Sequence, residues 1–200
     1  MKFDQLEDHV LWELISKGNS KAFAHIYNAF SSDLFKYGHK FTRDSELISD
    51  VIQDVYVHLW ESRKTLSIQK SIKFYLLSSF RRKLVRKIKT DKNQEALEDF
   101  HYNVSWQESF EEVLLENQIS LESSIKVTKA LENLSVRQKE AIFLRYIQEL
   151  SYEEISALMN IQVPSLYNLI FKGIKSMREF LSSSNFTARA IGFISLFLAC

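Results

Sequence analysis

The sequence predicts an all-α protein made of two small helical domains joined by an acidic linker, with a helix-turn-helix in the second domain. Glycine occurs only 4 times and proline once in 200 residues, against roughly 14 and 10 at average usage. Strand-like alternation is rare, whereas apolar residues recur at helical spacing over most of the chain. This composition argues against a turn-rich β-sandwich and against low-complexity segments.

The residue types that catalytic and metal sites need are scarce. The four glycines lie far apart, so they cannot form a glycine-rich loop that binds phosphate. The single Cys200 excludes an internal disulfide and a zinc site made of several thiolates. No two of the five histidines lie three or four residues apart, so no helix presents a histidine pair to a metal. We therefore expect no enzyme activity, no cofactor, no metal and no small-molecule substrate.

The two ends of the sequence do not predict membrane insertion. Residues 1–8 carry four charged side chains before any apolar run, which argues against a signal peptide. The apolar part of the tail, 186–200, contains Arg189 and is shorter than the ~20 residues that span a bilayer. We expect a cytoplasmic protein whose tail packs on its body, with membrane contact by the tail as the alternative.

The charges are strongly segregated, although the net charge is only +1. Residues 63–92 hold 11 basic groups and one acidic group, whereas residues 93–122 hold 8 acidic groups and no lysine or arginine. Like charges gathered in one block repel each other and weaken folding unless something neutralises them. The pattern therefore indicates charged partners, with mutual attraction of the two blocks inside the monomer as the alternative.

Amphipathic periodicity places the helices and the domain boundaries. Helices are expected over 4–17, 20–40, 44–62, 70–90, 122–133, 136–148, 152–159 and 164–181. The stretch 91–121 is polar and acidic and has weaker periodicity, so we expect it to be a linker. It separates a first domain, 1–90, from a second domain, 122–182, and an apolar tail follows over 183–200.

The helix expected over 44–62 has two distinct faces. Apolar residues at helical spacing form a stripe for the core, namely Ile48, Ile52, Val55 and Leu59. The same spacing on another face gives a mainly acidic surface with Gln53 beside it, namely Asp50, Asp54, Val57 and Glu61. Little on this acidic face can pair with its carboxylates, so we expect a partner to bind there. A solvated helix surface is the alternative.

The helix expected over 70–90 combines a core stripe with a basic outer face. The buried stripe consists of Leu77, Phe80, Leu84 and Ile88. The outer face and its flanks carry cations and one aromatic ring, namely Lys73, Tyr75, Arg81, Arg82, Lys83, Arg86, Lys87 and Lys89. No acidic residue occurs from Arg63 to Thr90, whereas a merely solubilising face normally mixes both signs. We therefore favour nucleic-acid binding, in which cations meet phosphates and rings stack on unpaired bases.

The second domain contains two capping boxes and a tight turn. Ser135 with Gln138, and Ser151 with Glu154, match the spacing in which each side chain caps a backbone N–H of the other. The second helix ends near Met159, and the turn 160–162 follows, with Asn160 suited to the left-handed conformation. Pro164 then opens the last helix. Two helices joined by so short a turn form a helix-turn-helix.

The last helix, expected over 164–181, presents its early outward residues for recognition. In a helix-turn-helix such residues reach base edges in the major groove. The outward and lateral positions near its start are Pro164, Ser165, Tyr167, Asn168, Phe171 and Lys172. Asn168 suits adenine, and Lys172 suits a phosphate or guanine. Since this face is rather apolar, a three-helix unit that binds protein is the alternative.

Two segments, taken together, resemble a known family. Residues 50–60 (DVIQDVYVHLW) resemble the D-x-x-Q-D-x-F-x-x-L-W pattern of the extracytoplasmic-function sigma factors of bacterial RNA polymerase. Residues 130–146 (ALENLSVRQKEAIFLRY), followed by 150–155 (LSYEEI), resemble the second conserved region of that family. Because both patterns occur in the right order across a linker, the chain is identified as similar to a sigma factor.

The resemblance implies roles for the charged faces. It implies that the helix 44–62 docks on the clamp helices of the polymerase, through Asp50, Gln53, Asp54 and Trp60. It implies that the next helix holds the −10 promoter element and a base from the opened strand, through Lys73, Tyr75, Arg81, Arg82, Arg86 and Lys89. It implies that the helix-turn-helix reads the −35 element as duplex while also touching the polymerase flap, and that an anti-sigma factor is a further partner.

Some positions depart from the family pattern. Arg82 and Arg86 stand where the family often has Asn and Asp. Asn160 replaces the turn glycine, Ser165 the usual threonine of the recognition helix, and Tyr167 a common basic residue. These changes are compatible with the fold, but they leave the promoter sequence open. A different class of protein also remains open, namely a helix-turn-helix regulator whose N-terminal helical domain serves as a sensor or for dimerisation.

Overall fold

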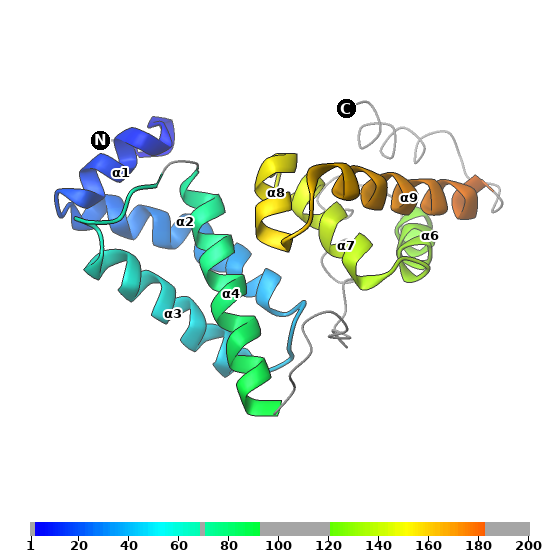
Figure 1. Cartoon of the computed structure of the whole chain (residues 1–200), viewed down its shortest axis with the longest axis horizontal. Helices are drawn as coiled ribbons and strands as arrows, with labels where there is room; N and C mark the ends of the chain where they lie inside the picture. Colours follow the sequence, from blue (N-terminus) through cyan, green and yellow to red (C-terminus); the bar gives the residue numbers. More distant parts are fainter. Residues whose placement is uncertain (1–2, 69–70, 93–120, 183–200) are drawn as a thin grey trace. The chain divides into compact units, whose positions relative to one another are not determined.

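The computed structural model describes residues 3–68, 71–92 and 121–182, and these form helices without any strand. The prediction of an all-α protein is confirmed. The chain divides into two compact units, unit 1 from Met1 to Val104 and unit 2 from Ser105 to Cys200. Each unit is described by itself below (Figure 1). Residues 93–120 of the expected linker, and the expected tail 183–200, lie outside the described residues.

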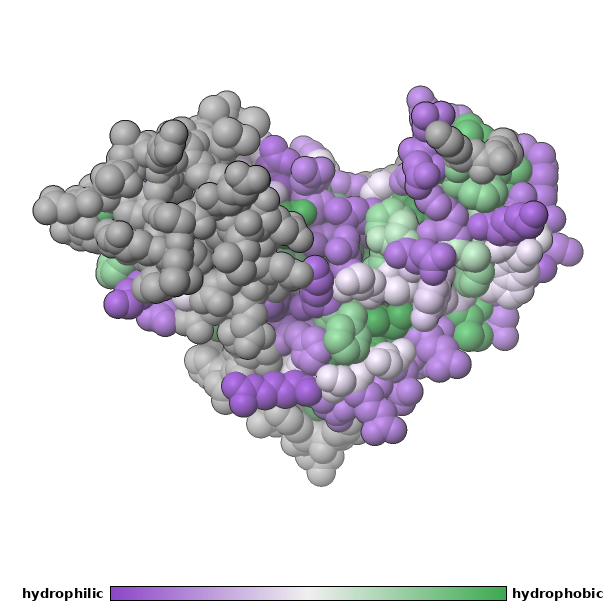
Figure 2. Space-filling view, turned by 180° about the vertical axis from the view of Figure 1, so that it is seen from behind, coloured by the Kyte–Doolittle hydropathy of each residue, from purple (hydrophilic) through white to green (hydrophobic). Residues whose placement is uncertain are grey.

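The described residues of unit 1 form four α-helices, labelled in Figure 1. A short 3₁₀ turn at Phe3–Gln5 precedes α1 (Asp8–Ser16), α2 (Ser20–Gly38), α3 (Ser45–Glu61) and α4 (Ile72–Lys92). Helices α2, α3 and α4 all pack on one another, and α1 packs on α2. The side chains predicted for the core of α3 and α4 are all buried there, namely Ile48, Ile52, Val55, Leu59, Leu77, Phe80, Leu84 and Ile88. The part of unit 1 seen in Figure 2 shows apolar residues only in small patches among hydrophilic ones.

Side-chain caps and one close approach set the geometry of unit 1. The Asn19 side chain accepts hydrogen bonds from the backbone of Lys21 and Ala22 at the start of α2, and Asp44 caps α3. At the end of α2, a Cβ on Gly38 would lie 2.7 Å from Ile48 Cγ2 and 2.9 Å from Phe80 Cζ. Only glycine therefore lets α2 come this close to α3 and α4.

The helix expected over 4–17 is wrong at its start. The first residues form the 3₁₀ turn, and α1 begins only at Asp8. At this start the Asp8 carboxylate makes a long-range contact, since it accepts a hydrogen bond of 2.7 Å from the backbone N–H of Ile72. This bond ties the start of α1 to the start of α4, which are 64 residues apart along the chain.

Within 121–182, unit 2 contains α6 (Leu121–Glu132), α7 (Val136–Ile142), a π-helical turn (Phe143–Ile147), α8 (Tyr152–Met159) and α9 (Val163–Ser182). Helix α9 packs on α6, α7 and α8. Both predicted capping boxes are confirmed, with Ser135 and Ser151 as the capping residues. Asn160 has φ 53° and ψ 52°, which confirms the left-handed turn.

The continuous helix expected over 136–148 is wrong in its second half. Beyond Ile142 the backbone forms the π-helical turn, in which the N–H of Gln148 donates to the carbonyl of Phe143. A π-turn holds an extra residue, and Phe143, Leu144 and Gln148 are all buried along it. Glu149 then takes a positive φ of 56°. The apolar pattern alone does not distinguish this wider turn from a regular one.

Within the described ranges, no helix is both long enough and apolar enough to cross a membrane.

Candidate nucleic-acid and partner interfaces

The acidic face of α3 is exposed, as the sequence predicted. Asp50, Gln53 and Asp54 are all exposed to solvent, on the side opposite the buried stripe. Val57 extends the same face and is one of the few large apolar side chains exposed in the described part of the chain. The three polar residues lie within two turns of one helix, so one partner helix can contact them together.

Trp60 lies at the edge of that face, seven residues after Gln53. Its indole ring lies 4.9 Å from the ring of Phe23 on α2, and the guanidinium carbon of Arg63 lies 4.2 Å from the indole centre. Arg63 also donates a hydrogen bond to the backbone carbonyl of Trp60. The tryptophan is half-buried, so part of its ring packs against α2 in an aromatic cluster and part remains accessible beside the acidic face.

The same cluster includes a buried tyrosine. The Tyr56 ring lies 4.8 Å from Tyr27 and 6.0 Å from Phe23, and its hydroxyl donates to the carbonyl of Ile26. Burial raises the pKa of Tyr56 to about 12. The hydroxyl therefore stays protonated and holds α3 against α2 beneath the acidic face.

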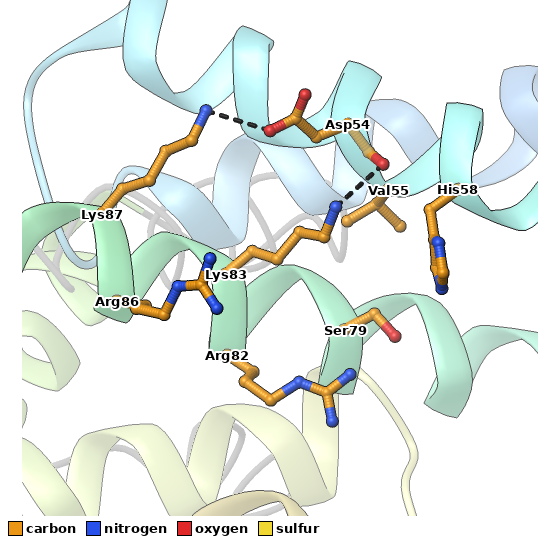
Figure 3. A pocket seen from close by; sticks show the side chains of 8 residues that line it. All are labelled: Asp54, Val55, His58, Ser79, Arg82, Lys83, Arg86 and Lys87. Carbon is orange, nitrogen blue, oxygen red and sulfur yellow. Dashed lines mark hydrogen bonds and ion pairs between the residues drawn. The ribbon is translucent and has the colours of Figure 1, made fainter.

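The expectation that the acidic face has little to pair with is wrong at Asp54. The Asp54 carboxylate forms an ion pair of 3.0 Å with Lys87 of α4, and Lys83 donates to the backbone carbonyl of Asp54 at 3.0 Å (Figure 3). The sequence placed both lysines on the flank of the basic helix, but it could not show that this flank meets α3. The spacing of four residues between Lys83 and Lys87, which places them on one side of α4, was the only feature of the sequence that could have suggested a shared partner.

Arg82 and Arg86 are the most accessible cations on the basic face of α4. Both are exposed, and in Figure 3 the Arg82 guanidinium points away from Asp54. Together with Lys83 and Lys87 they line a pocket of about 340 Å³ between α3 and α4, which His58 and Ser79 also border. Asp54 lines the same pocket and engages Lys83 and Lys87. The two arginines therefore remain to hold phosphate oxygens, since charge-assisted hydrogen bonds to phosphate are the strong ones.

The other predicted residues of this face are less accessible. Lys73, Tyr75 and Lys89 are partly buried. Arg81 is also partly buried, and its guanidinium carbon lies 6.0 Å from the ring of Phe41. The predicted set therefore divides into an exposed pair of arginines and four side chains that lie partly within the packing of unit 1.

In unit 2, the turn and α9 present all six predicted residues to solvent. Pro164, Ser165, Tyr167, Asn168, Phe171 and Lys172 are each exposed, whereas Leu166, Ile170 and Gly173 are buried on the opposite side. The turn between α8 and α9 is held by a hydrogen bond from the Ser156 hydroxyl to the carbonyl of Ile161. Helix α9 is thus anchored on one side and open on the other.

Sequence reasoning missed one residue of this surface. The rings of Tyr152 and Tyr167 are stacked, with centres 3.9 Å apart and planes 17° from parallel. Tyr152 lies on α8 and Tyr167 on α9, so helical spacing within one helix could not relate them.

Two family models match the chain. "Sigma-70 region 2" matches residues 26–94, and "Sigma-70, region 4" matches residues 124–177. Together they cover more than half of the chain, one in each unit, in the order that the resemblance implied. The chain belongs to the sigma-70 family, as an extracytoplasmic-function sigma factor.

Curated relatives agree with this identification. This chain is 24% identical to the ECF RNA polymerase sigma factor SigX of Bacillus subtilis, and the match covers 80% of this chain and 83% of SigX. It is 22% identical to the ECF RNA polymerase sigma factor SigK of Mycobacterium tuberculosis, and that match covers 82% of this chain and 87% of SigK.

Solved structures share the fold of the sigma factor. CnrH in complex with the cytosolic domain of CnrY matches with a TM-score of 0.56 and 18% identity, covering 88% of this chain and 97% of CnrH. The sigma factor RpoE of Bartonella quintana, in complex with the anti-sigma factor NepR, matches with a TM-score of 0.53 and 17% identity, over 81% and 98%. The predicted resemblance is confirmed, and the sigma factor directs transcription initiation as a DNA-binding factor.

Proposed function

We propose that this sigma factor binds the RNA polymerase core, directs it to promoters with −35 and −10 elements, and assists strand opening without catalytic chemistry of its own. The observation that carries the proposal is the sign change between consecutive helices of unit 1. Helix α3 presents Asp50, Gln53 and Asp54, and α4 presents Arg82 and Arg86. An acidic face suits a basic protein partner, and a basic face suits nucleic acid.

In this proposal residues 1–90 form the domain for core docking and the −10 element. The α3 face docks on the polymerase clamp through Asp50, Gln53 and Asp54, together with the half-buried Trp60 at its edge. Non-template DNA lies along α4, where the residues proposed to contact it are Lys73, Tyr75, Arg81, Arg82, Arg86 and Lys89. Extruding a base from the duplex costs a few kcal/mol, which stacking and phosphate contacts offset.

Residues 122–182 form the domain for the −35 element and the polymerase flap. Helix α9 enters the major groove through Pro164, Ser165, Tyr167, Asn168, Phe171 and Lys172. The acidic stretch 91–121 connects the two domains, and 183–200 is a separate apolar tail. An anti-sigma factor is a further partner, which the complexes of CnrH with CnrY and of RpoE with NepR support for those relatives. The protein acts in the cytoplasm, where its polymerase works.

The test is charge reversal on α3. The variant Asp50→Lys with Asp54→Lys should weaken core binding about 30-fold, since truncating a charge pair at an interface costs about 2 kcal/mol or more. Asp4→Lys, compared with Asp50→Lys alone, makes the same charge change at an exposed position of unit 1 that lies outside α3. Affinity is measured by fluorescence titration with purified core.

The result also separates the alternative function. A helix-turn-helix regulator with an N-terminal sensor or dimerisation domain would bind duplex DNA alone, ignore core, and respond equally to Asp50→Lys and Asp4→Lys. A sigma factor should form a stoichiometric complex with core and initiate transcription from some template in a genomic fragment library.

A further inference from the structure

The outward face of α9 carries two exposed aromatic rings one turn apart. Tyr167 is 50% exposed and Phe171 is 65% exposed, and they are two of the four large apolar side chains that are exposed in the described part of the chain. Residues at i and i+4 lie next to each other on a helix surface. An apolar pair of this kind, on a helix already anchored by its other face, indicates a contact surface.

The Tyr167 ring is held in place by unit 2. It stacks on Tyr152, which begins α8 directly after the capping residue Ser151. The guanidinium carbon of Arg145 lies 5.0 Å from the Tyr152 ring, and Arg145 donates a hydrogen bond of 3.0 Å to the carbonyl of Leu150. A ring already fixed by stacking loses little freedom on binding, so it can contribute more to affinity.

The surroundings of the two rings favour duplex DNA as the occupant. Helix α9 has no acidic residue from Val163 to Arg178, and its exposed Lys172 lies next to Phe171. Asn168 lies between the two rings along the helix and can pair with a base edge. A cation for phosphate, an amide for a base and two apolar rings form one continuous surface.

The major groove offers one apolar group to such rings. Guanine, cytosine and adenine show only donors and acceptors at their major-groove edges, whereas thymine also shows its C5-methyl group. An aromatic side chain that enters the groove therefore gains most next to thymine.

We propose that Tyr167 and Phe171 determine promoter specificity by contacting thymine methyl groups in the duplex element that α9 reads, and that Tyr152 is a positioning residue that holds the Tyr167 ring. This inference rests on the proposed function and names the base that the site selects. It also accounts for a tyrosine at a position where the resemblance implies a basic residue.

The test replaces thymine by uracil, which lacks only the methyl group. A promoter fragment is first isolated from a random duplex pool by transcription with the holoenzyme, and every thymine of its upstream element is then replaced by uracil. The wild-type holoenzyme should bind the uracil duplex about fourfold more weakly for each methyl contacted, as expected for one buried methyl group. The ratio of the two affinities is the readout.

The variants assign that ratio to residues. Phe171→Ala should weaken binding to the thymine duplex and bring the ratio toward one. Lys172→Ala is the matched control on the same face, because it should weaken binding to both duplexes equally and reduce the salt slope by about 0.9, as for one lost phosphate contact. Tyr152→Ala should reduce the ratio, and Tyr152→Phe, which keeps the stacked ring, should preserve it. Thermal unfolding of each variant shows whether unit 2 stays folded.

Two outcomes overturn the inference. The first is equal affinity of the wild-type holoenzyme for the thymine and uracil duplexes. The second is a Phe171→Ala variant that assembles poorly with core but keeps the wild-type ratio, which would assign the rings to a protein partner. Failure of the proposed function looks different, because the wild-type protein would then select no promoter from the pool at all.

Discussion

Helices α4 and α9 have nearly the same length but differ in what they present to solvent. Helix α4 has 21 residues with eight lysines and arginines, and α9 has 20 residues with three. Both bury one apolar face in their unit. On the outer face, α4 offers the exposed Arg82 and Arg86, whereas α9 combines the exposed Lys172 with Tyr167, Asn168 and Phe171.

The difference shows how one chain divides two tasks in DNA binding. Phosphate contacts supply affinity without reading sequence, and contacts to base edges supply specificity. A strand that has been opened must be held whatever its bases, so cations suit α4. A duplex element must be chosen among many, so rings and an amide suit α9. Binding through α4 should therefore depend more strongly on salt than binding through α9.

The largest effect is expected from reversing the two exposed arginines of α4. Arg82→Glu with Arg86→Glu should reduce promoter opening about 100-fold, because each charge-assisted contact contributes roughly 1.5 kcal/mol or more. The salt slope for single-stranded DNA should fall by about 1.4, at about 0.7 per phosphate contact. Permanganate reactivity of unpaired thymines in the open complex measures the opening.

A control variant shows whether the loss of opening comes from the position of Arg82 and Arg86 or only from the change in net charge. Lys21→Glu with Arg43→Glu makes the same charge change at two exposed positions of unit 1 that lie outside α4. It should leave most of the opening intact. If core affinity instead falls as much as opening does in the Arg82 and Arg86 variant, then α4 is not the DNA-binding helix of the pair.

Alkaline pH should weaken the unit that carries α4. Burial raises the pKa of Tyr56 to about 12, whereas a tyrosine in the unfolded chain titrates near 10. The folded state therefore resists deprotonation, and the stability that the neutral hydroxyl contributes is complete below pH 10 and is lost as the pH rises from 10 to 12. The loss should be about 2 to 3 kcal/mol in urea unfolding. Tyr56→Phe should remove this part of the pH dependence, and an unchanged pH profile in that variant would contradict the assignment.

Adding one methyl group should distinguish the packing of the two units. Gly38→Ala should destabilise unit 1 by about 2 kcal/mol, since overpacking a core costs 1–3 kcal/mol and the new Cβ would lie 2.7 Å from Ile48. Gly173→Ala on α9 should be near neutral. Its Cβ would lie 3.1 Å from the end of the Ile142 side chain, which can shift, and alanine favours a helix by about 1 kcal/mol. Urea unfolding of both variants measures this, and equal losses would mean that the two units are packed alike.

The smallest effect concerns the ion pair between α3 and α4. Asp54→Asn releases Lys87, so the protein without core should bind single-stranded DNA two- to threefold more tightly, with a salt slope steeper by about 0.7. Asp50→Asn changes the net charge equally but leaves the Asp54–Lys87 pair in place. It should leave the slope unchanged, and identical slopes for the two variants would show that Lys87 meets no phosphate.

Local features of this fold could be predicted because they depend on residues within about four positions. The capping boxes at Ser135 and Ser151 and the left-handed Asn160 are side-chain and backbone preferences that act within one turn. The buried stripes of α3 and α4 follow from helical periodicity alone. The exposed positions of α9 follow from the same periodicity, and so does the separation of an acidic face on α3 from a basic face on α4.

Contacts between different helices could be found only from the tertiary structure. Helical periodicity relates residues within one helix, and it says nothing about residues on two helices that are far apart along the chain. The sequence could not show that Lys83 and Lys87 reach Asp54, that Trp60 packs on Phe23, or that Tyr152 stacks on Tyr167. Nor could it show the hydrogen bond from Ile72 to Asp8, which joins the starts of α4 and α1. Helical periodicity determined which residues face outward, whereas the packing of one helix against another determined which of those residues are left to meet a partner.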